Sequence, residues 1–325
     1  MSRNICIVQD FLTQTHKEQI RATAEKNGFT PYFFTTSGMD AVKSCLREKN
    51  CEIVYAGSTE VLRAAPPCLQ WFASSAAGAD AYCSDPSLFA NPDCMLTSAN
   101  VYGVTIAEHV IMVTLMLLRR MPEYETSVRK QVWSVPLPVH SIRDGSFVIL
   151  GTGQIGRNIA ERLHGMGAAR VVGLSRSGRP VDAFDEVRPV SRLDETLPEA
   201  SFLIMVLPGT PETVGILNER RIQMLPDGAY VVNVGRGSAV EQDALCQALR
   251  TGKLAGAALD VMTPEPLPAG HPLWNMENLI LTPHISGNMT LGYTADANVA
   301  LFCENLTRYA AGEQLKCLVD RSRGY

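Results

Sequence analysis

One stretch, residues 146–179, constrains the fold more than any other part of this 325-residue chain. A strand-length apolar run opens it and leads directly into three glycines in G-x-G-x-x-G spacing: Gly151, Gly153 and Gly156. A helical pattern follows, with apolar residues every three or four positions, and a second apolar run at 171–174 predicts another strand. Strand, glycine turn, helix and strand within about thirty residues form the βαβ unit that binds a dinucleotide.

Each glycine of this motif has a predicted role. Gly151 lets the chain turn sharply, Gly153 lets the backbone approach a pyrophosphate, and Gly156 lets the helix pack closely on the strand. The N–H groups at the start of the helix, including those of Gln154 and Ile155, are expected to hold the phosphates together with the helix dipole. A purely structural turn is the alternative, but the strands and helix around the motif favour the dinucleotide site.

Length and composition limit the class of protein. A chain of 325 residues is long for a single core, so two domains are expected. The net charge of −4 argues against a nucleic-acid partner, and the longest apolar run, 110–118, is too short to span a bilayer. Nine cysteines without C-x-x-C spacing or clustered histidines indicate free thiols rather than disulfides or a metal site. The N-terminal apolar run is too short for a signal peptide, so we expect a cytoplasmic protein.

The first hundred residues alternate short apolar runs with amphipathic stretches. Strands are predicted at 5–8, 31–34, 53–55 and 70–73, with helices at 17–26 and 41–47. This alternation predicts a small parallel sheet with helices on its faces. After the fourth strand comes a run of small residues that includes Ala76, Ala77 and Gly78. Its backbone N–H groups could hold an anion, and a plain loop is an equally good interpretation of the residues alone.

Two segments connect the halves of the chain. Residues 104–119 predict a helix that is apolar on nearly every face, which is typical of a helix buried between domains or subunits. Residues 121–142 contain three prolines and are predicted to be irregular, as a linker or a protruding arm. Trp133 could anchor such an arm, although a tryptophan that is simply packed is the more common case.

Polar and reactive side chains follow the predicted strands of the second half. Apolar runs at 202–207, 229–234, 257–261 and 279–281 continue the βαβ pattern. Parallel strands present their carboxyl ends along one edge of the sheet, and ligands bind at this edge. The residues that follow these runs include Pro208, Thr210, Thr213, Arg236, Glu265 and His284.

The types of these residues fit one reaction. Hydride transfer between a nicotinamide and a carbonyl needs a proton donor beside the carbonyl oxygen, and His284 suits this task near neutral pH. Glu265 would fix the tautomer of the histidine and favour the imidazolium. Arg236 would bind a substrate carboxylate and polarise the adjacent carbonyl. Singly, each could be a loop residue, a helix cap or an interdomain bridge, but together they indicate a catalytic site.

The residues from about Gly78 onward resemble the D-isomer-specific 2-hydroxyacid dehydrogenases. The segments that carry the resemblance are Val231–Gly237 around the arginine, Leu259–Val261 with Glu265–Leu267, and Thr282–Gly287 around the histidine. The resemblance implies that Arg236, Glu265 and His284 are catalytic and that the Ala76–Gly78 loop binds the substrate carboxylate through its N–H groups. Arg236 and His284 are expected to contact the substrate as well. It also implies that these residues contact the cofactor: Leu207, Pro208, Thr210, Thr213, Val234 and Asp260.

The same resemblance implies an α/β fold with two Rossmann-like domains. A doubly wound parallel-sheet dinucleotide-binding domain is expected at residues 101–290. A flavodoxin-like substrate domain is expected at residues 1–100, completed by residues 291–325. Members of the family usually form homodimers.

Two departures from the family pattern matter. Members that prefer NAD carry an acidic residue after the second strand, whereas this chain has Ser175, Arg176 and Ser177. The missing carboxylate predicts a preference for NADPH over NADH. The Ser-Arg pattern resembles that of the NADPH-using reductases of glyoxylate and hydroxypyruvate, which implies reduction of a small 2-oxoacid of this kind. Met262 replaces an aromatic residue that is common in the family. A dinucleotide-sensing binding protein, as in the corepressors of this superfamily, is the alternative function, and turnover with 2-oxoacids would distinguish the two.

Overall fold

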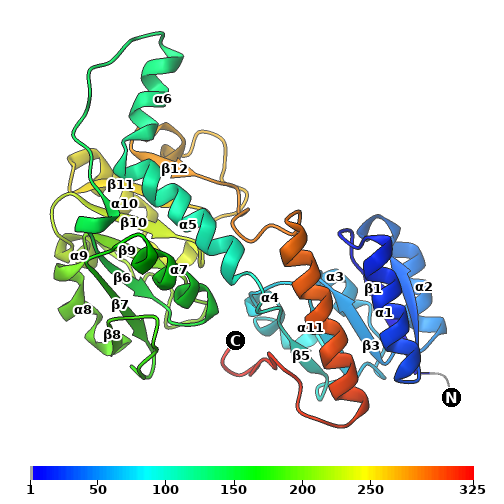
Figure 1. Cartoon of the computed structure of the whole chain (residues 1–325). Coiled ribbons are helices and arrows are strands. Elements are labelled where there is room, and N and C mark those ends of the chain that lie inside the picture. The colour runs from blue at the N-terminus through cyan, green and yellow to red at the C-terminus, as the bar shows by residue number, and fades with distance from the viewer. Residues whose placement is uncertain (1–2) are drawn as a thin grey trace. The chain divides into compact units, whose positions relative to one another are not determined.

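The computed structural model describes residues 3–325, which form two compact units (Figure 1). The first unit comprises the described residues up to Tyr102 together with Asn288–Tyr325. The second unit is the continuous segment Gly103–Gly287. Within residues 3–325, none of the helices has the length and apolar character that a membrane crossing requires.

A five-stranded parallel sheet with the order β2-β1-β3-β4-β5 forms the centre of the first unit, as in flavodoxin-like folds. The strands are β1 (Arg3–Val8), β2 (Phe29–Phe34), β3 (Ile53–Ala56), β4 (Trp71–Ser74) and β5 (Met95–Thr97). The helices are α1 (Gln14–Lys26), α2 (Met39–Glu48), α3 (Thr59–Arg63), α4 (Asp80–Cys83) and α11 (Gly292–Ala310). The sequence-based prediction lacks β5, because only two of its residues, Met95 and Leu96, are apolar and they form too short a run to recognise.

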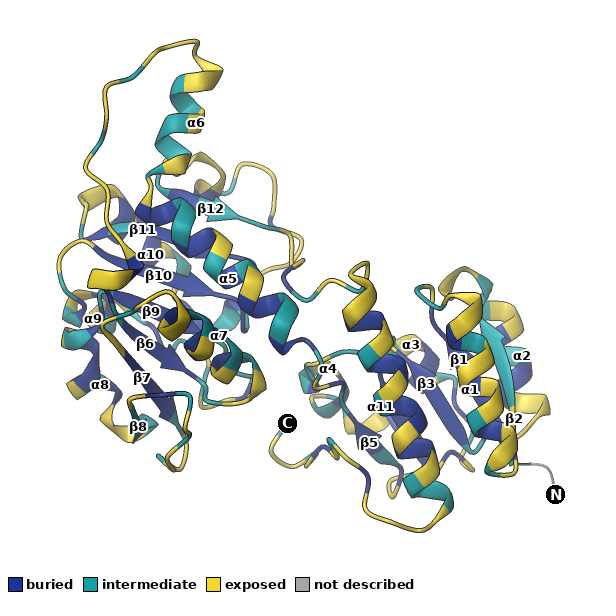
Figure 2. Cartoon of the chain, in the orientation of Figure 1, coloured by how far each residue is buried: buried dark blue, intermediate teal, exposed yellow. Residues whose placement is uncertain are grey.

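The two faces of this sheet carry separate cores. Ile5 and Ile7 pack on one face with residues of α1 and α11, whereas the alternate residues Cys6 and Val8 pack on the other face with α2 and α3. Phe302 of α11 stacks on the ring of Tyr55, with 4.2 Å between centroids. The buried side of α11 is visible in Figure 2. The C-terminal helix is therefore part of the core of the first unit.

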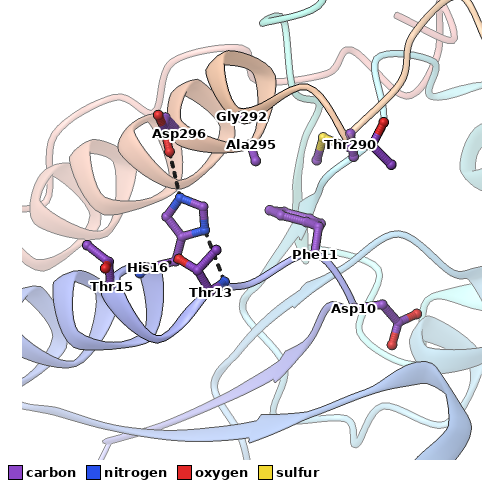
Figure 3. Close-up of a pocket in the computed structure, with 10 residues that line it drawn as sticks. Asp10, Phe11, Thr13, Thr15, His16, Thr290, Gly292, Ala295 and Asp296 are labelled. Atoms are coloured by element: carbon purple, nitrogen blue, oxygen red, sulfur yellow. Dashed lines mark hydrogen bonds and ion pairs between the residues drawn. The ribbon is translucent and has the colours of Figure 1, made fainter.

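α1 begins at a capping box in which a histidine stands at the third helical position. Oγ1 of Thr13 accepts the N–H of His16, and Nδ1 of His16 accepts the N–H of Thr13. Because Nδ1 is an acceptor, Nε2 carries the proton and donates to Oδ1 of Asp296 at 2.7 Å (Figure 3). This pair links the start of α1 to the start of α11.

A seven-stranded parallel sheet with the order β12-β11-β10-β9-β6-β7-β8 forms the second unit. Its strands are β6 (Ser146–Leu150), β7 (Arg170–Ser175), β8 (Glu186–Pro189), β9 (Phe202–Met205), β10 (Ala229–Asn233), β11 (Leu254–Leu259) and β12 (Leu279–Leu281). Its helices are α5 (Gly103–Leu118), α6 (Met121–Arg129), α7 (Gln154–Gly165), α8 (Leu193–Thr196), α9 (Glu219–Met224) and α10 (Gln242–Thr251). The strand order reverses between β6 and β9, and a doubly wound sheet binds its ligand at this switch point.

The segment after α5 differs from the sequence-based prediction. Residues 121–129 were expected to be irregular, but they form the helix α6, because a proline is tolerated in the first turn of a helix and Pro122 stands there. The segment 130–141 has no regular structure and stands away from the sheet of its unit (Figure 1). Trp133 is fully exposed, so its side chain is not packed against the rest of the described chain.

α5 is only partly buried, although its sequence is apolar on nearly every face. One side packs on the second unit through residues such as Ile106, Val110 and Val113. The other side carries Met112, which is 47% exposed. The expectation of a helix buried all round therefore does not hold within this chain.

Candidate active site

The glycine motif forms the connection between β6 and α7. Gly151 has a φ of +112°, which favours glycine. A Cβ atom at Gly156 would lie only 1.9 Å from the carbonyl oxygen of Gly151, so a side chain there would separate the helix from the turn. Gly153 has no atom within 4 Å of a Cβ position, which leaves its outer side open.

The first turn of α7 fits an anionic ligand. Gly153 is the N-cap and provides no side-chain hydrogen bond to the helix. Among the described residues, the N–H groups of Gln154, Ile155 and Gly156 have no hydrogen-bond partner. Free N–H groups at a helix N-terminus, beside an open glycine, are suited to the pyrophosphate of a dinucleotide.

The carboxyl end of β7 carries a hydroxyl and a guanidinium in place of a carboxylate. Oγ of Ser175 accepts the N–H of Gly178 at 3.1 Å and so closes the turn that follows the strand. Arg176 and Ser177 are exposed on this turn. A hydrogen bond from Thr210 is the main cause that lowers the pKa of Glu212, and the charge of Arg176 contributes as well. Arg176 therefore lies near a carboxylate that the sequence analysis did not identify.

The loop after β9 is held together by one hydroxyl. Oγ1 of Thr213 accepts the N–H of Thr210 at 2.9 Å and donates to the carbonyl of Pro208 at 2.7 Å. This hydroxyl is thus engaged within the loop. The backbone of Leu207 is packed so closely that a Cβ atom at Gly235 would lie 2.6 Å from its oxygen.

Arg236 stands on a tight turn after β10. Asn233, which is fully buried, holds this turn, because its Nδ2 donates to the carbonyl of Arg236 and its Oδ1 accepts the N–H of Gly235. Gly237, which follows Arg236, is packed against the next loop: a Cβ atom there would lie 2.1 Å from the backbone of Met262. The flanking glycines are therefore required by packing, and Asn233 is a positioning residue that the sequence analysis missed. A buried polar residue at the end of a strand is the signal for it.

Asp260, directly after β11, is 1% exposed and binds the loop that carries His284. Its Oδ1 accepts the hydroxyl of Thr282 at 2.6 Å and the N–H of Ile285 at 2.9 Å, and its Oδ2 accepts the N–H of Ser286 at 2.9 Å. Burial alone would raise the pKa of this carboxyl, but these hydrogen bonds outweigh it and lower the pKa. Asp260 is therefore ionised and fixes the histidine loop.

His284 and Glu265 are in direct contact. Nδ1 of His284 lies 2.8 Å from Oε2 of Glu265, while Oε1 of the same carboxylate accepts the N–H of Met262. The backbone of His284 has a φ of +55°, and its N–H donates to the carbonyl of Asp260. With Nδ1 donating to the carboxylate, Nε2 remains available on an imidazole that is half exposed. The side chain of Met262 packs in the core of the unit.

In the first unit, the loop after β4 contains the small residues Ala76, Ala77 and Gly78. Ser75 donates its N–H to the carbonyl of Ala56, and Ala76 donates its N–H to Oγ of Ser74. Among residues 3–325, the N–H groups of Ala77 and Gly78 have no hydrogen-bond partner, and neither residue is buried. They are therefore free to bind an anion.

A hollow of about 600 Å³ lies within the first unit, beside the contact of α1 with α11 (Figure 3). It is lined by the loop before α1, by the first turns of α1 and α11 and by Met289 and Thr290. Its polar groups are already engaged in part, since Asp296 binds His16 and Asp10 accepts the N–H and the hydroxyl of Thr36. None of the residues that the sequence predicts for the site lines it.

Comparisons with known proteins agree on one family. A family model described as "D-isomer specific 2-hydroxyacid dehydrogenase, NAD binding domain" matches residues 111–286. Glyoxylate/hydroxypyruvate reductase A of Salmonella newport is 34% identical over 256 residues, which cover 77% of this chain and 80% of the relative.

Solved structures of whole chains are similar as well. A D-isomer specific 2-hydroxyacid dehydrogenase family protein from Aeromonas salmonicida is 31% identical, with a TM-score of 0.82 over 99% of this chain and 100% of the other. A D-isomer specific 2-hydroxyacid dehydrogenase from Xanthobacter autotrophicus, solved with NADPH and MES, is 28% identical, with a TM-score of 0.82 over the full length of both chains.

Proposed function

This chain belongs to the D-isomer-specific 2-hydroxyacid dehydrogenase family, and we propose that it reduces glyoxylate or hydroxypyruvate to the D-2-hydroxyacid with NADPH. Membership makes it a nicotinamide-dependent oxidoreductase of small 2-hydroxyacids and 2-oxoacids. The contact between His284 and Glu265 is the main support for a catalytic role, because a histidine paired with a carboxylate is suited to proton transfer.

In this proposal the residues of the second unit have separate tasks. The bound dinucleotide supplies the hydride, which adds to the carbonyl carbon of the 2-oxoacid. His284 holds the proton on Nε2 and donates it to the carbonyl oxygen, so that a hydroxyl forms. Glu265 orients the imidazole through its contact with Nδ1. Arg236 binds the substrate carboxylate and polarises the carbonyl.

The proposed preference for NADPH rests on the turn after β7. An acidic residue at Ser175 would bind the ribose hydroxyl of NADH and repel a phosphate, but this chain has none there. Arg176 and Ser177 are exposed on the same turn and can bind a phosphate. The relative from Xanthobacter autotrophicus was solved with NADPH, which agrees with this choice.

We also propose that the protein forms a homodimer through α5 and the segment after α6. Met112 of α5 is exposed, and so are five large apolar residues at the end of α6 and in the segment that follows it: Val128, Val132, Trp133, Val135 and Val139. Apolar surface of this kind is typical of a protein interface. Sedimentation of the purified protein would test this, and a monomer at micromolar concentration would refute it.

NADPH oxidation in the presence of a panel of 2-oxoacids tests the proposed function. We expect turnover with glyoxylate and hydroxypyruvate and loss of it in His284→Ala. Tight binding of NADPH without turnover of any 2-oxoacid would refute the proposal and favour a dinucleotide-sensing role.

A further inference from the structure

The carbonyl oxygen of Ser75 is held by two side chains that are distant in sequence. Nδ2 of Asn298 donates to it at 3.0 Å, and the hydroxyl of Tyr102 donates to it as well. All three residues belong to the first unit and are buried. Two donors on one carbonyl fix the peptide plane that joins Ser75 to Ala76, at the entrance to the small-residue loop.

A third side chain determines which way the amide of Asn298 points. The hydroxyl of Tyr55 donates to Oδ1 of Asn298 at 2.6 Å. The carbonyl of Ser75 can only accept, so it requires the Nδ2 side of the amide. The two contacts therefore select a single orientation. Tyr55 is in turn held by its stack on Phe302.

Both tyrosines are protonated donors over the whole physiological range. Burial raises the pKa of Tyr102 to about 12 and that of Tyr55 well above its usual value. The hydrogen bonds that reach the Ser75 carbonyl thus do not change with pH. They form a fixed network of neutral groups in the interior.

The remaining polar groups at the start of the loop are also engaged. The N–H of Ser75 donates to the carbonyl of Ala56, and the N–H of Ala76 donates to Oγ of Ser74. The carbonyl of Ala76 accepts the N–H of Ala99. Beyond this point the N–H groups of Ala77 and Gly78 are free among the described residues. The network therefore ends where the proposed carboxylate-binding groups begin.

We propose that Asn298 is a positioning residue for substrate binding, which together with Tyr55 and Tyr102 orients the N–H groups of Ala77 and Gly78 toward the substrate carboxylate. This inference rests on the proposed function. Asn298 does not touch the substrate. It acts through the Ser75 carbonyl, and it belongs to α11, far in sequence from the loop that it holds.

Replacement of Asn298 by leucine tests the proposal against a matched control. Asn298→Leu keeps a similar volume and removes the hydrogen bonds of the amide with Ser75 and Tyr55, together with its longer contacts to Tyr102 and Met289. Asn305→Leu is the control, because Asn305 is equally buried in α11 and also binds the backbone. Its partners are the N–H and carbonyl of Lys316, which are not part of the Ser75 network. Tyr55→Phe is a milder variant that keeps the stacked ring and removes only the hydroxyl that orients Asn298. If Asn298→Leu fails to fold, the result with Tyr55→Phe decides whether the network positions the loop.

Two readouts separate positioning from general damage. The first is KM and kcat for glyoxylate, with the Ki of oxamate, an unreactive carboxylate. We expect Asn298→Leu to raise KM and Ki about ten- to a hundredfold, Tyr55→Phe to raise them about three- to tenfold, and kcat to change less than KM. The second is amide hydrogen exchange of a peptide covering residues 75–79, which should become faster in both variants and not in Asn305→Leu.

The outcomes are distinct. An equal rise of KM in Asn305→Leu, or unchanged exchange of residues 75–79 in both Asn298→Leu and Tyr55→Phe, would overturn the positioning role. If the unmodified protein turns over no 2-oxoacid, the proposed function fails. In that case faster exchange in the Asn298 and Tyr55 variants would still show that the network holds the loop, and unchanged exchange would show that it does not.

Discussion

The carboxylate of Glu265 joins two parts of the active-site edge, since Oε2 lies 2.8 Å from Nδ1 of His284 and Oε1 accepts the N–H of Met262. The second contact fixes the carboxylate on the strand end, so the histidine meets a partner that is already oriented. The half-exposed imidazole is thereby held by a group that cannot easily turn away.

Glu265→Gln is expected to lower kcat for 2-oxoacid reduction by about tenfold or more, because the carboxylate that orients Nδ1 of His284 at 2.8 Å is lost. The affinity for NADPH should change little, since Glu265 acts on the histidine. His284→Ala should lose about 10²–10⁴-fold in kcat. A kcat that Glu265→Gln leaves unchanged would rule out the dyad.

Arg236→Ala is expected to lose about 2–5 kcal/mol of transition-state binding, by analogy with removal of one partner of a buried charge pair. The loss should appear in kcat/KM for the 2-oxoacid, while the affinity for NADPH stays nearly constant. Arg192→Ala is a suitable control, because Arg192 is an exposed arginine that pairs with Glu195. An equal loss of NADPH affinity would assign Arg236 to the dinucleotide or to the fold.

The unmodified protein is expected to prefer NADPH over NADH by about tenfold or more in kcat/KM, because charge-assisted hydrogen bonds contribute roughly 1.5–3 kcal/mol each. Arg176→Ala should weaken NADPH binding, more so at low salt, and leave NADH binding nearly unchanged. Glu212→Gln should strengthen NADPH binding slightly, since it removes a negative charge near Arg176. A preference of the unmodified protein for NADH would contradict this interpretation of the β7 turn.

Gly156→Ala is expected to lower the free energy of unfolding by about 1–3 kcal/mol, because the new methyl group would lie against the Gly151 carbonyl. NADPH binding should weaken with it. Gly165→Ala lies in the same helix, where no atom is within 4 Å, and should leave stability unchanged or raise it by up to about 1 kcal/mol. Thermal unfolding of both variants measures the difference. Equal Tm values would show that α7 can shift to accept the methyl group.

Asp260→Asn is expected to destabilise the protein by about 1–3 kcal/mol at neutral pH, since an amide cannot accept all three hydrogen bonds. The folded pKa of Asp260 is lowered, so its contribution is complete above the unfolded value of about 3.9 and is lost as the pH falls through the folded value. The difference in Tm from the unmodified protein should therefore shrink in acid. Asp227→Asn, which changes an exposed carboxylate, should show no such trend.

Periodicity and motif spacing were enough to predict the two parallel sheets and the edge of the second sheet that bears Arg236 and His284. The strand pattern around Gly151 is local, and so is the order of strands and helices that gives an α/β fold its class. The strands β5 and β8 were missed because neither is a continuous apolar run: β5 has only two apolar residues, and β8 contains Glu186 and Arg188. α6 was missed because Pro122 indicates a break, although its position in the first turn allows a helix.

Contacts between distant residues could not be predicted in the same way. Asn298 reaches the carbonyl of Ser75 across 223 positions, and no spacing rule connects them. Asp260 is another example, because its hydrogen bonds with Thr282, Ile285 and Ser286 could not be read from the sequence. Its contact with the cofactor, which the resemblance implies, stays a prediction. Side-chain orientation within a fold depends on packing, which a single sequence does not specify.

The contribution of α11 to the first unit bears on the order in which the chain can fold during synthesis. The ribosome releases the β1–β5 strands and α1 first, yet the rings of Tyr55 and Trp71 lack their stacking partner until Phe302 of α11 emerges. The second unit is one continuous segment and can complete its sheet before then. The core of the first unit, whose strands are translated first, is therefore completed last. Its exposed aromatic residues are the part of the nascent chain that most needs protection from aggregation.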